Sequence, residues 1–464
     1  MPEKKAYMQE TAGQDGCVTI VGGGYVGLAL AAHLVTNGHS VVLVEADSTR
    51  RDAVARGEMP IYEVGVDSVF AKAMRDSAVT VTGDLRRALD ETRMVFVAVG
   101  TPSAADGHPD LSAVNSVVSE LRIHAKPGTV VVLKSTVPPG TTRRVQEQLH
   151  GAPFRLPVVC CPEFLREGSA LHDMRSAARH VVGGDDAESM LRVAEVVVGT
   201  PEALVVMTDS TSAELIKYGS NSFLALKISF ANELARFADQ VGADIVQVVQ
   251  GMGLDPRIGM EGLHAGVGFG GCCLPKDVRA LISAATDHGT PFATLTAAMQ
   301  VNSGQREMLA NKVRHALGGR LDGCRVAVLG LAFKAGTDDV REAPSLDVIR
   351  HLLAQGADVT AHDPCATDNA APSLPPQVRL ARDPYECLTG ADAAAILTEW
   401  PDYLRLDWDR ARRTMRQPVL VDGRNCLDPA AIARLGFRYY AVGRPPVHGP
   451  HQPPAIAPGQ AGQV

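Results

Sequence analysis

The stretch GFGGCCLPKD, residues 268–277, places two adjacent thiols, an amine and a carboxylate within a few positions of one another. Pro275 is favoured in the first turn of a helix, and DVRALISAA continues with helical spacing. Cys273 is therefore expected beside a helix N-terminus with Lys276 nearby, a setting that favours a nucleophilic thiolate. Asp277 would share its helical face. The alternative is that both cysteines are inert packing residues, as most free cysteines are.

Three glycines follow the β-rich run CVTIV at residues 17–21 and open an apolar-periodic segment that ends at Asn37-Gly38. The pattern is Gly22-x-Gly24-x-x-Gly27 between a strand and a helix. It predicts a dinucleotide-binding turn, in which the helix N-terminus, with Tyr25 and Val26 in its first turn, meets the pyrophosphate.

The next β run, SVVLVEAD, carries Glu45 at its end, 21 residues after Gly24. A carboxylate there accepts hydrogen bonds from the ribose hydroxyls and repels a 2′-phosphate, so NAD is expected rather than NADP. Arg50 keeps NADP open, although an arginine there also suits an adenine pocket. A solvated strand end is the plain alternative for Glu45.

The elements that must position these groups form two α/β patterns. Further β runs at 79–82, 94–98 and 129–133 alternate with helical segments, which predicts a parallel, doubly wound sheet over about the first 200 residues. A second α/β pattern begins at Cys324 and echoes the first without its glycine fingerprint. Between them, apolar residues recur at helical spacing for some 30 residues from about 210. That segment predicts a long helix that serves as a spine or an oligomer interface.

Composition narrows the functional classes. The chain has 464 residues and a formal charge of −7, with 45 basic and 52 acidic residues, so nucleic acid and anionic membranes are not expected partners. No signal peptide or membrane-spanning run is evident. The nine cysteines form neither a disulfide framework nor a zinc motif, so no metal and a cytoplasmic location are expected.

Nine motifs, in order, resemble those of the nucleotide-sugar 6-dehydrogenases, the UDP-glucose/GDP-mannose dehydrogenase family. They run from about residue 17 to 443: GYVGLALA, MPIYEVG, AVGTPSAADGHPDLS, KSTVPPGTT, PEFLREGSA, AELIKYGSNSFLALKISFANE, GLDPRIG, GFGGCCLPKD and GLAFKAGTDDVREAPS. The resemblance implies a four-electron oxidation of a sugar C6 alcohol to a carboxylate with two NAD⁺ reduced. A cysteine captures the aldehyde as a thiohemiacetal, and hydride loss leaves a thioester that water hydrolyses.

The resemblance assigns roles residue by residue. Cys273 aligns with the family nucleophile, whereas Cys272 stands where serine is usual. Lys217 and Asn221 match residues that stabilise the C6 oxyanion and hold substrate. Asp277 resembles the acid/base group that orients water, and Thr136 of KSTVP resembles the threonine that positions it.

Of the two carboxylates in PEFLREG, Glu167 resembles the family carboxylate near the reacting centre and Glu163 lies on the NAD and water side. Which of them transfers protons is open. The remaining expected NAD contacts are Thr101, Thr136, Glu167, Lys276 and Arg341. The remaining expected substrate contacts are Phe164, Leu165, Glu167, Arg257, Phe269, Gly270, Lys334 and Arg424.

The patterns and the resemblance together imply a domain plan: a flexible N-terminal extension at 1–16, an NAD-binding domain at 17–209, a helical domain with the cysteine loop at 210–310 and a nucleotide-sugar-binding domain at 311–443. The segment 444–464 is rich in Pro, Gly and Gln, so it is expected to be a disordered tail. The arginine of the DPRIG motif reaches a neighbouring subunit's sugar in the family, so Arg257 implies at least a homodimer.

UDP-glucose is the expected substrate, with GDP-mannose and TDP-glucose as alternatives, since the base pocket cannot be read from these motifs. Two other classes stay open: a two-electron hydroxyacid-type dehydrogenase, which needs no cysteine, and a non-catalytic NAD-binding protein.

Overall fold

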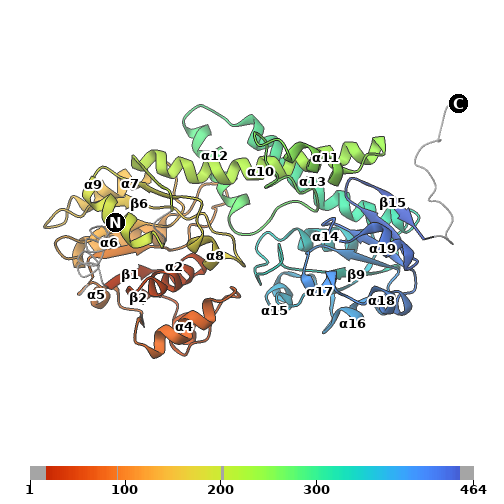
Figure 1. The fold of residues 1–464 in the computed structure, drawn as a ribbon, viewed down its shortest axis with the longest axis horizontal. Coiled ribbons are helices and arrows are strands. Elements are labelled where there is room, and N and C mark those ends of the chain that lie inside the picture. Colours follow the sequence, from red (N-terminus) through yellow and green to blue (C-terminus); the bar gives the residue numbers. More distant parts are fainter. Residues whose placement is uncertain (1–16, 91, 200–202, 450–464) are drawn as a thin grey trace. The chain divides into compact units, whose positions relative to one another are not determined.

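The computed structural model describes residues 17–90, 92–199 and 203–449. The chain divides into two compact units. The first holds the chain up to Phe223 together with Lys276–Phe292, and the second holds Leu224–Pro275 and the chain from Ala293 onward. Figure 1 shows the elements of both units. The predicted extension at 1–16 lies outside the described residues.

The first unit is built on an eight-stranded sheet of order β3-β2-β1-β4-β5-β6-β7-β8. The first six strands follow the nucleotide-binding order 3-2-1-4-5-6. The strands are β1 (Cys17–Val21), β2 (Ser40–Val44), β3 (Val79–Thr82), β4 (Met94–Val97), β5 (Val130–Leu133), β6 (Val158–Cys160), β7 (His180–Gly183) and β8 (Val205–Thr208).

The expectation of a wholly parallel first sheet needs one correction, because β6 and β7 pair antiparallel. The segment between them contains a single short helix, α8 (Ala170–Arg175). A parallel connection requires a crossover across the sheet face. The chain instead returns at the edge it left, so β7 and β8 run against the other strands.

Helices cover both faces of this sheet. On one face, alternate strand residues such as Ile20 and Phe96 pack with α2 (Tyr25–Thr36), α4 (Val66–Arg75), α8 and α9 (Ala187–Val197). On the other face, Val21 and Val97 pack with α5 (Leu85–Ala88), α6 (Ser112–His124) and α7 (Thr141–Leu149). The unit also contains α3 (Ser48–Ala55). Because successive strand residues point to opposite faces of the sheet, the strands contribute side chains to two separate cores.

The second unit repeats this plan with a seven-stranded sheet of order β11-β10-β9-β12-β13-β14-β15. Its strands are β9 (Arg325–Leu329), β10 (Asp358–His362), β11 (Arg379–Leu380), β12 (Ala393–Ile396), β13 (Val419–Asp422), β14 (Arg438–Ala441) and β15 (Arg444–His448). Its later helices are α14 (Pro344–Ala354), α15 (Thr367–Ala370), η1 (Ala371–Ser373), α16 (Pro384–Leu388), α17 (Pro401–Leu404), α18 (Trp408–Thr414) and α19 (Pro429–Arg434).

The predicted tail at 444–464 is partly ordered, because β15 pairs antiparallel with β14 at the sheet edge. Proline-rich composition suggested disorder, but an edge strand tolerates prolines, which lack a ladder donor. The Arg444 guanidinium also binds Asp244 at 3.0 Å, which fixes the strand's start. Residues 450–464 lie outside the described residues.

The long helix is confirmed as α10 (Ser210–Val241), a continuous ribbon in Figure 1. It is followed by α11 (Ile245–Gly253), α12 (Leu274–Asp287) and α13 (Ala293–Ala316). Within the first unit, Glu214 of α10 accepts hydrogen bonds from the backbone N–H groups of Gly140 and Thr142 at the start of α7. This buried carboxylate holds the start of α10 against the sheet domain.

The pseudo-repeat is visible in matching details of the two sheets. Gly22 after β1 and Gly330 after β9 both have left-handed φ, +112° and +104°. An acid ends the second strand of each copy, and each accepts from the glycine loop: Glu45 from the Gly23 N–H, and Asp363 from Leu331 N–H. The predicted class, two Rossmann-like sheets and a long helix, is therefore confirmed. Within the described ranges, no helix combines the length and apolarity needed to span a bilayer.

Candidate functional site

In the glycine loop after β1, two of the three glycines are required by close packing, and the third leaves room for a ligand. A Cβ on Gly27 would overlap the carbonyl oxygen of Gly22, and one on Gly22 would lie 2.5 Å from the Ala98 oxygen. A Cβ on Gly24 would meet nothing within 4 Å. Gly22 and Gly27 are thus required by the fold itself, whereas Gly24 leaves open space where a phosphate can approach the backbone.

The helix that follows, α2, begins at Tyr25 with Gly24 as its N-cap and no side-chain cap hydrogen bond. Tyr25 and Val26 are half-buried in its first turn. Backbone N–H groups at an uncapped helix start bind anions.

Glu45 is buried, which excludes the solvated strand end considered from sequence. One carboxylate oxygen accepts from Gly23 N–H and the other from Asp47 N–H, both at 2.8 Å. Each oxygen keeps capacity for a second hydrogen bond, which suits ribose hydroxyls. The Arg50 guanidinium lies 3.6 Å from this carboxylate and is 44% exposed. The loop, Glu45 and Arg50 therefore fit a dinucleotide such as NAD.

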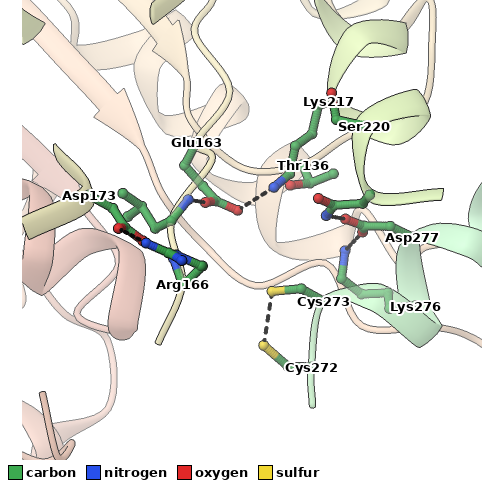
Figure 2. Close-up of polar contacts among 12 residues, drawn as sticks. Thr136, Glu163, Arg166, Asp173, Lys217, Ser220, Cys272, Cys273, Lys276 and Asp277 are labelled. Carbon is green, nitrogen blue, oxygen red and sulfur yellow. Dashed lines mark hydrogen bonds and ion pairs between the residues drawn. The ribbon is translucent and has the colours of Figure 1, made fainter. Parts of the chain in front are cut away.

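Lys217 of α10 and Glu163, which follows β6, form an ion pair of 2.8 Å between Nζ and Oε1 (Figure 2). Their side chains are only 3% and 5% exposed. Burial raises the pKa of Glu163, but the Lys217 ammonium outweighs it by charge and hydrogen bonding, so the pKa falls below its ordinary value. The structure thus brings together two predicted site residues that lie 54 positions apart in sequence.

The PEFLREG segment that carries Glu163 is fixed along its length. The second Glu163 oxygen accepts from Leu165 N–H. The Arg166 guanidinium binds Asp173 at 2.7 Å, and Glu63 accepts from the backbone N–H groups of Gly168 and Ala170. Glu167 is therefore held half-buried between anchored neighbours.

A second polar network joins five predicted residues. Asp277 is 1% exposed, and its two oxygens accept from the Asn221 amide and the Lys276 ammonium, both at 2.6 Å. The Lys276 ammonium also lies 3.4 Å from Thr101 Oγ1, and that hydroxyl donates to the Thr136 carbonyl at 2.9 Å. The predicted spacing of four between Lys217 and Asn221 places both on one face of α10, each with a buried carboxylate partner.

The cysteine loop of the second unit leads directly into α12. Phe269 is clamped through its backbone: its N–H donates to Asn302 Oδ1, and its carbonyl accepts from Asn302 and Arg306. A Cβ on Gly270 would overlap the Glu342 carbonyl. Cys272 and Cys273 are half-buried, with their sulfurs 3.3 Å apart (Figure 2). Cys273 is the residue before α12 begins.

Two predicted residues, Arg424 and Lys334, lie beside Phe333 in the second unit. The Arg424 guanidinium donates to the carbonyls of Phe333 and Leu397 and lies 3.1 Å from Glu399. The Lys334 ammonium lies 5.8 Å from the centre of the Phe333 ring. A cation near an aromatic ring and a second cation on the adjoining backbone suit a base and diphosphate.

Other predicted residues are held by neighbours on their own loops. Arg257 is 87% exposed and binds Asp255, and Arg341 is 56% exposed and binds Asp339. Asp363 is a structural anchor, because it accepts from backbone N–H groups on two loops and from the Trp400 indole.

Sequence reasoning missed three residues that the structure places beside predicted ones. Phe333 precedes Lys334, and only the GLAFK motif pointed towards it. The Arg179 guanidinium stacks 3.9 Å over the Phe164 ring, on a segment with no recognised motif. Lys134, in KSTVP, is 5% exposed and lies beside Cys161. For Lys134 the signal is the burial of a charged side chain, which no local sequence pattern reports.

Comparisons with known proteins agree with this architecture. Models of the UDP-glucose/GDP-mannose dehydrogenase family match residues 17–198 for the NAD-binding domain, 211–304 for the central domain and 327–429 for the UDP-binding domain. UDP-glucose 6-dehydrogenases of Rhizobium meliloti and Pseudomonas aeruginosa are each 42% identical, covering 92% of this chain and 99% and 97% of theirs. A UDP-glucose dehydrogenase structure from Pyrobaculum islandicum has a TM-score of 0.85 at 36% identity, covering 93% of this chain and 98% of its own. The chain therefore belongs to the UDP-glucose/GDP-mannose dehydrogenase family.

Proposed function

We propose that this protein oxidises UDP-glucose to UDP-glucuronate, using NAD and a covalent intermediate on Cys273. The observation that carries the proposal is the position of Cys273 directly before α12, the helix whose Asp277 is buried against Asn221. The relatives at 42% identity are named for UDP-glucose, and the matching C-terminal model is a UDP-binding domain. A GDP-mannose dehydrogenase structure is only 27% identical, against 42% for the UDP-glucose relatives, which disfavours that alternative.

The chemistry requires a group that holds the sugar between two oxidations. Bound NAD supplies the hydride acceptor for each of them. The Cys273 thiolate adds to the C6 aldehyde and forms a C–S bond, giving a thiohemiacetal. Loss of hydride leaves a thioester, and water then displaces the thiolate to give the carboxylate.

Lys217 and Asn221 stabilise the negative charge that develops on the C6 oxygen. A buried cation acts strongly on such charge because little water screens it. Glu163 fixes the Lys217 ammonium through the 2.8 Å ion pair and is held ionised by it. We therefore assign Glu163 an anchoring role and leave proton transfer to Glu167.

Water for thioester hydrolysis is oriented by Asp277 and Thr136, which belong to the second polar network. Thr101, Lys276 and Arg341 would bind the cofactor together with the glycine loop. Phe164, Leu165, Phe269 and Gly270 would enclose the sugar, and Lys334 and Arg424 the nucleotide end.

The experiment measures the NADH formed per sugar consumed with UDP-, TDP- and GDP-sugars. We expect UDP-glucose to be preferred and two NADH to form per sugar. One NADH per sugar would indicate a two-electron dehydrogenase, and no NADH with any of these sugars would indicate a non-catalytic NAD-binding protein. Cys273→Ala is expected to lower turnover by about 10³-fold or more. Unchanged turnover in that variant would refute the covalent route.

We also propose a homodimer in which Arg257 reaches the partner's site. Phe223, Phe230 and Phe237 recur at intervals of seven on α10 and are 62%, 47% and 64% exposed. Such a stripe of exposed aromatic residues on one helix face is typical of an interface. The exposed Arg257 guanidinium fits a role outside its own subunit.

Mixing inactive Arg257→Ala and Cys273→Ala proteins under conditions of subunit exchange tests the shared site. A mixed dimer regains one intact site of two in half of the population, so about a quarter of wild-type activity should return. No recovery despite demonstrated exchange would overturn the proposal. A cytoplasmic location is proposed on the nine free thiols.

A further inference from the structure

The chain contains two pairs of adjacent cysteines in contrasting settings. Cys160 ends β6 and Cys161 follows it, both about 1% exposed. Their side chains enter separate cores on opposite faces of the sheet, as successive strand residues do. Burial also raises the pKa of Cys160 well above its ordinary value. Cys160 and Cys161 are therefore packing residues.

Cys272 and Cys273 differ in both geometry and exposure. Both are half-buried, and their sulfurs lie 3.3 Å apart on the same side of the loop (Figure 2). At that distance one S–H can donate to the other sulfur, which stabilises negative charge on the acceptor. The start of α12 immediately afterwards favours the same charge.

The loop before the pair allows little rearrangement. Gly271 has φ of +80°, donates its N–H to the Arg341 carbonyl at 3.0 Å, and would bring a Cβ within 2.7 Å of the Phe333 ring. On the other side, helix α12 begins at Leu274. The two thiols are therefore held between a fixed turn and a helix, and their proximity follows from that backbone.

We propose that Cys272 and Cys273 form a redox modification site, in which a peroxide oxidises Cys273 and Cys272 resolves it as a vicinal disulfide. In the first step the Cys273 thiolate attacks the peroxide, forming an S–O bond and releasing hydroxide, or alkoxide from an organic peroxide. In the second, the Cys272 sulfur attacks Cys273–SOH, forming the S–S bond and releasing water. Two thiols thus lose two electrons to the peroxide.

The modification is reversible for a geometric reason. Adjacent Cα atoms lie about 3.8 Å apart across a trans peptide, shorter than the 4.4–6.8 Å usual for disulfides. A disulfide closed over one peptide bond is strained, and strained disulfides are readily reduced by thiols. Cys272 therefore protects the reactive thiol from irreversible oxidation to sulfinic and sulfonic acids while stopping turnover.

The inference rests on the proposed reactivity of Cys273, so the experiment measures the mass of the cysteine peptides as well as the activity of the enzyme. The full chain is treated with a several-fold molar excess of hydrogen peroxide, its free thiols are blocked, and the tryptic peptide 258–276 is weighed. Its only cysteines are Cys272 and Cys273. We expect this peptide to lose the mass of two hydrogens, and activity to fall and then return with dithiothreitol. Peptide 156–166, which carries Cys160 and Cys161, should stay reduced.

The matched variant is Cys272→Ser, whose reduced form should turn over like the wild type. After peroxide, its peptide 258–276 should gain two or three oxygens, and dithiothreitol should not restore its activity. The inference is overturned if the wild-type peptide never loses two hydrogens, or if the variant recovers as fully as the wild type. Failure of the proposed function would appear separately, as turnover that persists in Cys273→Ala.

Discussion

Lys217 Nζ and Glu163 Oε1 are 2.8 Å apart, and their side chains are almost wholly shielded from water. A buried ion pair adds little stability relative to apolar residues, yet removing one partner leaves a charge without compensation. Stability alone therefore does not explain this ion pair, whereas a fixed ammonium would serve the reaction. Its presence beside Asn221 on α10 is the structural reason to place oxyanion stabilisation there.

Breaking this pair should destabilise the fold as well as the chemistry. Lys217→Met leaves the Glu163 carboxylate buried and unpaired, so the free energy of unfolding should fall by about 3–5 kcal/mol. The double variant Lys217→Met/Glu163→Leu should recover most of that loss while remaining inactive. Urea denaturation and initial rates measure the two effects. A double variant less stable than Lys217→Met would contradict the account of an uncompensated charge.

Asp277 should affect turnover more than substrate affinity. Asp277→Asn removes the negative charge that holds the Asn221 amide and the Lys276 ammonium. Loss of an acid/base group costs about 10²–10⁴-fold in rate, so kcat should fall within that range while the KM for UDP-glucose changes little. Asp287→Asn, on the same helix and 56% exposed, is the control and should leave kcat unchanged. A fall in both variants would point to damage to α12.

Two glycines of the loop after β1 should separate folding from cofactor binding. Gly24→Ala adds a methyl group where nothing lies within 4 Å, so the melting temperature should stay unchanged. NAD affinity should fall about tenfold or more, because the methyl group occupies the approach to the pyrophosphate. Gly27→Ala must overlap the Gly22 carbonyl and should lower stability by about 1–3 kcal/mol. Calorimetric titration with NAD and thermal melts of both variants test these expectations. Unchanged NAD affinity in Gly24→Ala would refute the assignment of Gly24 to the pyrophosphate approach.

His180 should make stability depend on pH. It lines a cavity of about 220 Å³ with Lys134 and His33. Burial, the Lys134 charge and His33 lower the pKa of His180 to about 4. Between pH 6.5 and 4 the unfolded state therefore binds the extra proton, and stability falls as pH falls.

For a ring that is only partly buried, this contribution is about 1–3 kcal/mol. His180→Gln should therefore lose less stability between pH 6.5 and 4 than the wild type, as measured by urea denaturation at several pH values. The pKa of exposed His108 is raised by its hydrogen bond to Asp287, so its contribution has the opposite sign. His108→Gln should lose more stability on acidification, and parallel curves for all three proteins would contradict both assignments.

The glycine fingerprint, Glu45 and the long helix could be predicted from sequence, because each depends on local spacing. A strand's period of two and a helix's period of 3.6 are written directly in the positions of apolar residues. The roles of Cys273, Lys217, Asn221 and Asp277 came from resemblance, since no local rule distinguishes a catalytic lysine from a surface one.

The tertiary structure decided what depends on contacts between distant segments. It reversed β7 and β8, ordered residues 444–448 at a sheet edge, and made Asp363 a loop anchor. It also separated two identical Cys-Cys dipeptides, one divided between two cores and one with its sulfurs in contact. Burial and partner choice are properties of the packed chain, and a sequence read locally contains neither.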